Sequence, residues 1–357
     1  MATPRSVLLP VRPVWVHVIS RCVRKAYLCG GRDGRWEYRR KWVEDRLAEL
    51  TTVFAVEIAA YAVMSNHVHV VLRLDPEIAA GWSDAAVVAR WTTLFGKRLP
   101  RETDGRIVLG ALDGLAANAA WVAERRRRLA DVSWLMRALC EDIARRANAE
   151  DGCTGRFWEG RVTSVPLLDQ AALIACMAYV DLNPIRARIA DRPEVSARTS
   201  IHGRIRQRQR HRVTTRMAEQ AVSPVASVTQ HTAIGLTARV INSEEGLWCC
   251  PLARCVAGEP LAQTRFTTDD YLSLVDLTGR VIKSGKRGAI PAHLAPMLNR
   301  LDLEVDDWLS TMQKGGTLTA GALGHHAQRA TEALRRGLRW VRNTCALFAA
   351  RPAAHAA

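Results

Sequence analysis

The chain has 357 residues, of which 51 are Lys or Arg and 35 are Asp or Glu, so it carries a formal net charge of +16. This balance favours a polyanionic partner such as nucleic acid, and the 48% apolar content is ample for a core in about two domains. No uninterrupted apolar stretch is long enough to cross a bilayer, and residues 1–13 do not resemble a targeting segment. We therefore expect a cytoplasmic protein with no membrane partner.

The nine cysteines are scattered and include no C-x-x-C pair. Their only cluster is Cys249, Cys250 and Cys255. An odd number at this spacing favours reduced thiols over a disulfide framework or a zinc site.

The first half of the chain reads as alternating strands and helices. Residues 14–28 contain β-branched residues typical of a strand, residues 38–50 have apolar side chains at helical spacing, and residues 52–60 and 61–74 read as two adjacent strands. Residues 84–148 have helical periodicity and suggest a helical hairpin that ends in the glycine-containing segment 152–160. These patterns predict a β-α-β-β order followed by helices.

A further helix is predicted from Asp169, a plausible N-cap, to Asp181. It should end near Asn183, because Pro184 disfavours helical geometry in the residue before it. Tyr179 and Asn183 are four residues apart, so a helix that reaches Asn183 places them one turn apart on the same face.

The most informative short motif is Asn66-His67-Val68-His69-Val70. Side chains at i and i+2 leave the same face of a strand, so His67 and His69 form half of a potential divalent-metal site. A pair of hydrogen-bonded structural histidines is the alternative. Tyr179 has a similar alternative as a core tyrosine, and Asn183 as a helix C-cap.

Four ordered stretches resemble the REP-associated tyrosine transposases, which are single-tyrosine members of the HUH superfamily. The stretches are Arg21-Cys22, Tyr61 to Val70, Gly155 to Arg161, and Tyr179 to Ala187. The resemblance covers about residues 10–190. It implies an α+β fold with a ferredoxin-like β-α-β-β-α-β core, in which an antiparallel sheet has helices on one face and the tyrosine lies on a helix that faces the histidine pair.

The resemblance also implies the chemistry. Tyr179 would attack a DNA phosphodiester, with Mg²⁺ or Mn²⁺ held by His67, His69 and Asn183, and would leave a 5′-phosphotyrosine and a free 3′-hydroxyl that can later be rejoined. No nucleotide cofactor is expected, and the chain has no G-x-x-x-x-G-K-[ST] loop. In one departure from some related transposases, Met64 stands three residues before His67, where those enzymes have an acidic ligand.

Several basic and aromatic residues are candidate contacts to single-stranded or hairpin DNA. They are Arg156, Phe157, Trp158 and Arg161 in the loop, Arg186 and Arg188 after the tyrosine, and the run Arg125, Arg126, Arg127 and Arg128. A packing turn with buried Phe157 and Trp158 is the alternative for the loop. A solvated helix face is the alternative for the run.

We expect a catalytic domain at residues 1–190, a basic linker or arm at 191–240, an accessory domain for DNA recognition or docking at 241–350, and a disordered tail at 351–357. Arginines alternate with polar residues between Arg198 and Arg216, which fits either a disordered stretch or an exposed helix. Helical patterns at residues 294–309 and 328–347 continue the accessory domain.

The sequence therefore predicts a metal-dependent transposase that cleaves and rejoins single-stranded DNA at structured repeat elements. A domesticated, non-catalytic DNA-binding protein or repressor on the same scaffold is the alternative. A replication initiator or relaxase would share the chemistry but fits the flanking motifs less well. The sequence leaves open whether the protein is a monomer or a homodimer.

Overall fold

The structure is a computed structural model that describes residues 14–31, 34–220, 248–255, 266–284, 298–299, 301, 303–314, 321–343 and 345–348. The predicted tail at 351–357, residues 221–240 of the predicted linker and parts of the predicted accessory domain lie outside these ranges. No helix within them is long and apolar enough to cross a membrane.

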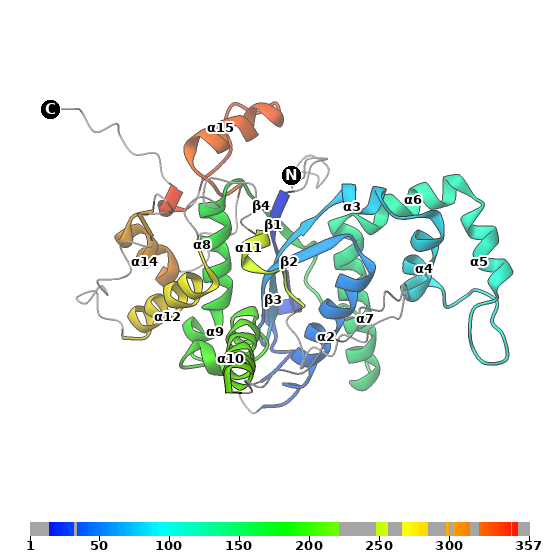
Figure 1. Ribbon diagram of the computed structural model, residues 1–357, viewed down its shortest axis with the longest axis horizontal. Helices are drawn as coiled ribbons and strands as arrows, with labels where there is room; N and C mark the ends of the chain where they lie inside the picture. Colours follow the sequence, from blue (N-terminus) through cyan, green and yellow to red (C-terminus); the bar gives the residue numbers. More distant parts are fainter. Residues whose placement is uncertain are drawn as a thin grey trace.

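Four antiparallel strands form one sheet in the order β2-β3-β1-β4 (Figure 1). The strands are β1 (Val14–Arg21), β2 (Val56–Val63), β3 (His67–Leu74) and β4 (Thr163–Leu167). Helix α2 (Arg39–Val53) connects β1 to β2, and α7 (Val132–Glu150) precedes β4. This is the predicted β-α-β-β-α-β order within an α+β fold.

The sequence prediction placed the boundary between β2 and β3 wrongly. Tyr61 belongs to β2 and pairs with Val70, whereas residues 61–74 were expected to form a single strand. The chain turns instead at Ser65 and Asn66, between Met64 and His67. A tight hairpin needs only a few polar residues, so the apolar residues on both sides of the turn read as one continuous run.

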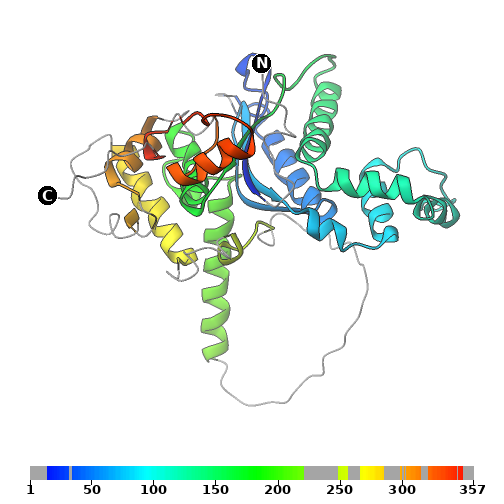
Figure 2. The ribbon, with the colours of Figure 1, turned by 90° about the horizontal axis from the view of Figure 1, so that it is seen from above.

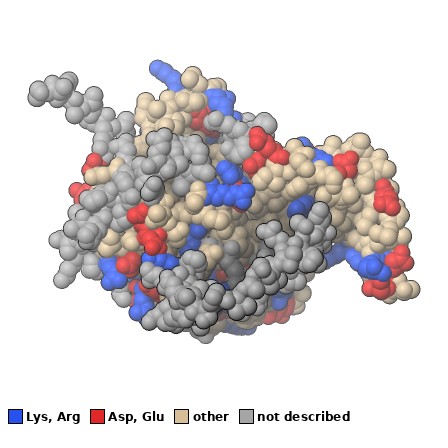
Figure 3. Space-filling view, in the orientation of Figure 1, with Lys and Arg blue, Asp and Glu red and all other residues tan. Residues whose placement is uncertain are grey.

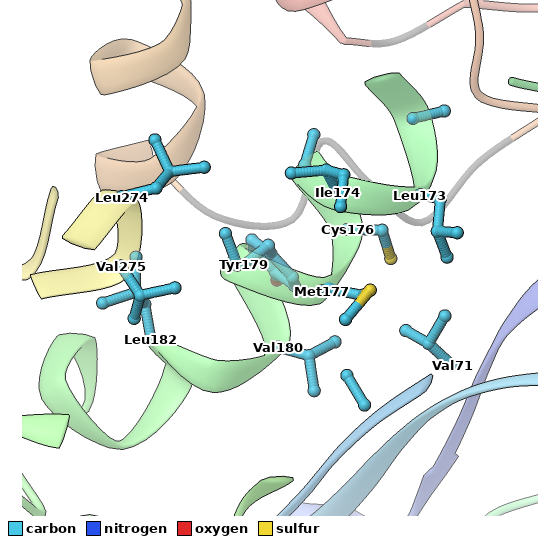
Figure 4. Close-up of a cluster of buried hydrophobic side chains, with 14 of the residues drawn as sticks. Val71, Leu173, Ile174, Cys176, Met177, Tyr179, Val180, Leu182, Leu274 and Val275 are labelled. Atoms are coloured by element: carbon cyan, nitrogen blue, oxygen red, sulfur yellow. The ribbon is translucent and has the colours of Figure 1, made fainter. Parts of the chain in front are cut away.

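The two faces of the sheet pack against different helices. Val16, Val18, Val70 and Leu72 belong to a core shared with α2 and α7. The opposite face carries Ala60, Ala62 and Val71 and packs against α8 (Gln170–Asp181), in which every residue is buried. Figure 4 shows Met177 and Val180 of α8 directed toward Val71. The helix predicted to carry Tyr179 therefore lies on the same face of the sheet as the histidine pair.

Asp169 is the N-cap of α8, as predicted, and its side chain accepts a hydrogen bond from the Ala172 amide. The helix ends at Asp181, and a separate short helix, α9 (Asn183–Arg186), follows. Pro184 lies in the first turn of α9, where its missing N–H has no helical partner to lose.

An insertion of four helices between β3 and α7 extends away from the sheet in both views (Figures 1 and 2). It comprises α3 (Pro76–Ala80), α4 (Asp84–Phe95), α5 (Leu109–Ala116) and α6 (Ala119–Leu129). The sequence predicted a helical hairpin here. The observed segment has more and shorter helices, because the caps Ser83, Asn118 and Asp131 begin new helices within it.

The basic segment after residue 198 forms a helix, α10 (Ser200–Gln220), which decides between the two predicted alternatives. Its first turns pack against the core, since Arg204 is buried and donates hydrogen bonds to the carbonyl oxygens of Ala59 and Cys250. Figure 2 shows the rest of α10 leading away from the sheet.

The described C-terminal helices are α11 (Leu252–Cys255), α12 (Thr268–Ser284), α14 (Val305–Lys314) and α15 (His326–Arg335), and the described 3-10 turns are η1 (Val23–Lys25), η2 (Pro193–Val195) and η5 (Ala346–Phe348). Helix α11 lies beside β2, where Arg254 pairs with Glu57, and α15 begins beside Asp169 at the start of α8. Helices α12 and α14 share a core with α8 on its side away from the sheet. Leu274 and Val275 of α12 share a core with α8, and Figure 4 shows them near Leu182. The phenol of Tyr271 donates a 2.6 Å hydrogen bond to the buried carboxyl of Asp181. The end of α8 is thus held by the sheet on one side and by α12 on the other.

Candidate active site

The register of β1 and β3 brings several polar side chains to the face of the sheet that α8 covers. Arg21 pairs with His67, Ile19 with His69, and His17 with Val71. Antiparallel partners point to the same face, and so do residues two apart along a strand. His17, Arg21, His67 and His69 therefore share one face.

Of these residues, Arg21, His67 and His69 line a pocket of about 420 Å³ between the sheet, the β2–β3 turn and the end of α8. The pocket is lined by Arg21, Lys25, Met64, Asn66, His67, His69, Tyr179, Asn183, Arg186 and Ala187. The structure thus brings together Tyr179 and all three predicted metal ligands, although His67 and His69 lie more than a hundred residues before Tyr179 and Asn183 in the sequence.

Each imidazole of the histidine pair is oriented by a hydrogen bond to its Nδ1. His67 Nδ1 lies 2.6 Å from Asn66 Oδ1, and the Asn66 amide donates to the carbonyl oxygen of Lys25. His69 Nδ1 lies 2.9 Å from His17 Nε2, and the two rings stack with centroids 5.1 Å apart. A ligand role for either histidine requires its Nδ1–H to donate, which leaves the Nε2 lone pair for a metal.

The surroundings keep both imidazoles neutral at pH 7. Burial, with smaller contributions from the positive charges of Arg21 and Arg186, lowers the pKa of His67 from 6.5 to about 4. Burial also lowers the pKa of His69 well below its usual value, and His17 and His67 add to this effect. Neutral imidazole is the form that binds metal.

The side-chain amide of Asn183 forms hydrogen bonds through both its nitrogen and its oxygen. Its Nδ2 donates to the carbonyl oxygens of Tyr179 and Val180, at 3.0 and 3.4 Å, and so satisfies the end of α8. Its Oδ1 points the other way and accepts a 2.9 Å hydrogen bond from Arg186 Nη2. The C-cap interpretation of Asn183 is wrong, because Leu182 is the C-cap of α8 and Asn183 is the first residue of α9. The role of its Oδ1 as a metal ligand stays a prediction.

Tyr179 is buried at the end of α8, with only 3% of its surface exposed. Its ring approaches His69 and His17 edge-on, with centroid separations of 5.9 and 6.2 Å. The guanidinium of Arg186 lies 4.4 Å from the ring centroid, and its Nη2 is 3.4 Å from the phenol oxygen. The phenol oxygen of Tyr179 is therefore beside a guanidinium cation.

The donor set allows a divalent metal but is sparse. Within the described ranges, no group of three or more His, Cys, Asp and Glu side chains has metal-binding geometry. A metal would use the two imidazoles together with the amide oxygen of Asn183, and this nitrogen and oxygen set fits Mn²⁺ or Mg²⁺. Met64 is buried at the pocket and supplies no oxygen, so substrate or water would complete the shell.

The predicted DNA-binding loop packs against the strand that carries Arg21. Phe157 is buried, and its carbonyl accepts a hydrogen bond from the Val23 amide, while Trp158 donates from Nε1 to the carbonyl of Cys140 at 2.9 Å. Because these contacts are internal, Phe157 and Trp158 fit the alternative of a packing turn with two buried rings. Arg156 and Arg161 are exposed.

The run Arg125–Arg128 does not line the pocket. Arg125 lies over the rings of Trp91 and Trp121, and Arg126 donates to the carbonyl oxygens of Ala79 and Trp82. Arg127 and Arg128 both pair with Glu124. The contacts of Arg125 and Arg126 join α6 to α4 and α3, whereas the ion pairs with Glu124 lie within α6. The role of the run in DNA binding stays a prediction. Arg186 lines the pocket, and Arg188 is exposed just beyond it.

The sequence interpretation missed His17, Lys25 and Asn66 as site residues. Trp15, His17, Ile19 and Arg21 alternate along β1 and so occupy one face. His17 and Arg21, two polar residues four positions apart on one face of an otherwise largely apolar strand, were the available signal for His17.

No protein-family model matches this chain, and no curated protein matches it. A solved structure of a REP-associated tyrosine transposase bound to a REP hairpin is similar to it, with 14% sequence identity over 65% of this chain and 96% of that chain, and a TM-score of 0.32. At so low a TM-score, only the geometry of the pocket carries a functional assignment.

Proposed function

We propose that this protein cleaves and rejoins single-stranded DNA, with Tyr179 as the nucleophile. The observation that carries the proposal is the placement of the Tyr179 phenol in one pocket with two neutral imidazoles, an amide oxygen and the guanidinium of Arg186. A phenol beside cationic groups and neutral metal-ligand side chains suits attack on a phosphodiester.

In the cleavage step the phenol oxygen of Tyr179 forms a bond to phosphorus, and the bond from phosphorus to the 3′-oxygen breaks. The phenol loses its proton to solvent, and the departing 3′-oxygen takes up a proton. Arg186 donates hydrogen bonds to the phosphate, and the packing of α8 holds the phenol oxygen in position for attack. The reverse reaction with another 3′-hydroxyl rejoins the strand without a nucleotide cofactor.

Mg²⁺ or Mn²⁺ bound to Nε2 of His67 and His69 and to Oδ1 of Asn183 would act as a Lewis acid on a non-bridging phosphate oxygen. His17 and Asn66 orient the two imidazoles for this role through the hydrogen bonds to Nδ1.

The proposal extends to hairpin-containing repeat DNA as the substrate. It is supported by the net charge of +16, which attracts a polyanion. On the face drawn in Figure 3, basic and acidic residues are interspersed, with no single large basic patch among the coloured residues. Phosphate recognition at the pocket itself therefore carries more of the argument than a continuous basic surface.

Transfer of a 3′-end label to protein tests the proposal. Wild type is incubated with Mn²⁺ and a single-stranded library that carries a fixed hairpin beside a randomised segment, and the products are separated on a denaturing gel. We expect a labelled protein band for wild type and for the control Tyr27→Phe, whose tyrosine is 52% exposed, and none for Tyr179→Phe. A gel shift under native conditions with no covalent band in wild type would support the non-catalytic DNA-binding protein instead.

A further inference from the structure

The charges around the pocket are unusual for a divalent-metal site. Three of its lining residues, Arg21, Lys25 and Arg186, are cationic, and none is Asp or Glu. Arg21 and Lys25 are exposed at the rim, whereas Arg186 is half-buried. In the part of the chain that the structure describes, no carboxylate forms an ion pair with any of the three. Their positive charges act on the pocket without compensation by an acidic side chain.

Of the three cationic residues, Arg186 would disfavour metal binding most strongly. Its Nη2 donates to Asn183 Oδ1 at 2.9 Å, and this oxygen is the third protein ligand available to a metal. A guanidinium and a divalent cation that share one oxygen repel each other strongly in a partly buried site. Metal binding therefore competes with the hydrogen bond from Arg186 to Asn183.

The second terminal nitrogen of Arg186, Nη1, indicates which ligand would end this competition. Arg186 Nη1 is buried and has no hydrogen-bond partner. A buried charged donor without an acceptor is costly, and a phosphate oxygen is the acceptor that suits a guanidinium best. An anion in the pocket would satisfy Nη1 and would also neutralise part of the field of Arg21 and Lys25.

We propose that the pocket is primarily a phosphate site, and that bound phosphate, held by Arg186 with Arg21 and Lys25 at the rim, is what allows the divalent metal to bind. This rests on the proposed function in one respect, because it takes the physiological anion to be the scissile DNA phosphate. Phosphate offers Arg186 an acceptor other than Asn183 Oδ1 and adds negative charge and oxygen ligands beside the imidazoles. Metal and phosphate then bind with positive cooperativity.

Reciprocity makes the inference measurable without any turnover. If phosphate raises the affinity for Mn²⁺ by some factor, Mn²⁺ must raise the affinity for phosphate by the same factor. The full chain is titrated with MnCl₂, with free Mn²⁺ followed by electron paramagnetic resonance, in the presence of inorganic phosphate or of chloride at equal ionic strength. Protein-free titrations correct for the complex of Mn²⁺ with phosphate.

For wild type we expect at least a tenfold gain in Mn²⁺ affinity with phosphate, and phosphate binding without metal that is detectable by calorimetry. Arg186→Gln should weaken metal-free phosphate binding at least tenfold, strengthen Mn²⁺ binding in chloride, and reduce the gain with phosphate to less than threefold. Arg206→Gln removes an equal charge from an exposed position on α10 and should behave as wild type. If Arg186→Gln does not fold, as judged by circular dichroism, Arg186→Lys keeps the charge but loses the fork geometry and should show a reduced gain.

Equal Mn²⁺ affinity in phosphate and chloride for wild type would overturn the inference, and so would phosphate binding that is unchanged in Arg186→Gln. These outcomes are separate from failure of the proposed function. A wild-type protein that forms the covalent adduct but shows no cooperativity refutes the phosphate site alone. Cooperativity without an adduct refutes the nuclease function and leaves the phosphate site standing.

Discussion

The pH dependence of stability provides a quantitative test of the environment of His67. The pKa of His67 is lowered by burial from 6.5 to about 4, so the folded state resists a proton that the unfolded chain accepts. A lowered folded-state pKa gives stability that is present above pH 6.5 and is lost as the pH falls toward 4. The difference between 6.5 and about 4, at about 1.36 kcal/mol for each pH unit, corresponds to about 3 kcal/mol.

When the pH falls from 7.5 to 4.5, wild type should lose about 2.5 kcal/mol of this contribution of His67 to the free energy of unfolding, as calculated from the same two pKa values. His67→Gln keeps a polar side chain but cannot be protonated, so its stability should fall by about 2.5 kcal/mol less than that of wild type over this interval. Urea denaturation followed by circular dichroism at both pH values measures the change. Other titrating groups are present in both proteins and cancel in the comparison.

His326→Gln is the matched control, because His326 is exposed at the start of α15 and does not line the pocket. It should lose as much stability as wild type on acidification. If His67→Gln and wild type lost stability equally between pH 7.5 and 4.5, His67 would not be a buried neutral imidazole, and its role as a metal ligand would lose its physical basis.

Three further variants test the packing around the site. Burial raises the pKa of Asp181 from 3.8 to about 6, so its contribution to stability is present below pH 3.8 and is lost as the pH rises through 6. Wild type should therefore lose about 2 kcal/mol through this group between pH 4.5 and 7.5. Asp181→Asn should abolish that loss, as measured by urea denaturation at both pH values. Tyr271→Phe should cost about 1.5–3 kcal/mol at pH 7.5, because a buried carboxyl loses its phenol donor, and a cost below about 0.5 kcal/mol would contradict that bond. Phe157→Ala should cost about 3–5 kcal/mol of stability, because the ring is buried. The affinity of the folded variant for single-stranded DNA, measured by fluorescence anisotropy, should stay within about twofold of wild type. A large loss of affinity at unchanged stability would instead support a base-stacking role for Phe157.

The parts of the site that were predicted from the sequence depend on local spacing. The i, i+2 spacing of His67 and His69 on a strand, and the i, i+4 spacing of Tyr179 and Asn183 near the end of a helix, fix which side chains share a face. Asp169 as an N-cap is equally local. That the two pairs meet in one pocket came from the family resemblance, because spacing alone does not place α8 on a particular face of the sheet.

His17 shows why the rest was harder to predict. Its contact with His69 joins residues 52 positions apart and depends on the register of β1 and β3. Register is set by the packing of whole strands, so no short window contains it. The same limit applies to Lys25 and Asn66, which reach the pocket through a turn and a loop.

The basic and aromatic residues illustrate a different limit. Arg125 near Trp91 and Trp121 forms internal cation–π contacts, and the same residue types would suit a nucleic-acid surface. Composition cannot separate the two, because both depend on a guanidinium near a ring. Arg204 on α10 makes the same point, since it is buried against the core within a segment whose composition favoured an exposed linker or arm.

The most direct test of the account is to identify the residue that carries the DNA. Wild type is allowed to react with the single-stranded hairpin library, the adduct is trimmed with nuclease and digested with trypsin, and the modified peptide is sequenced by mass spectrometry. The account predicts a nucleotide 5′-phosphate esterified to the phenol oxygen of Tyr179, with loss of the signal in Tyr179→Phe. A nucleotide on any other residue, or an adduct that persists in Tyr179→Phe, would contradict it.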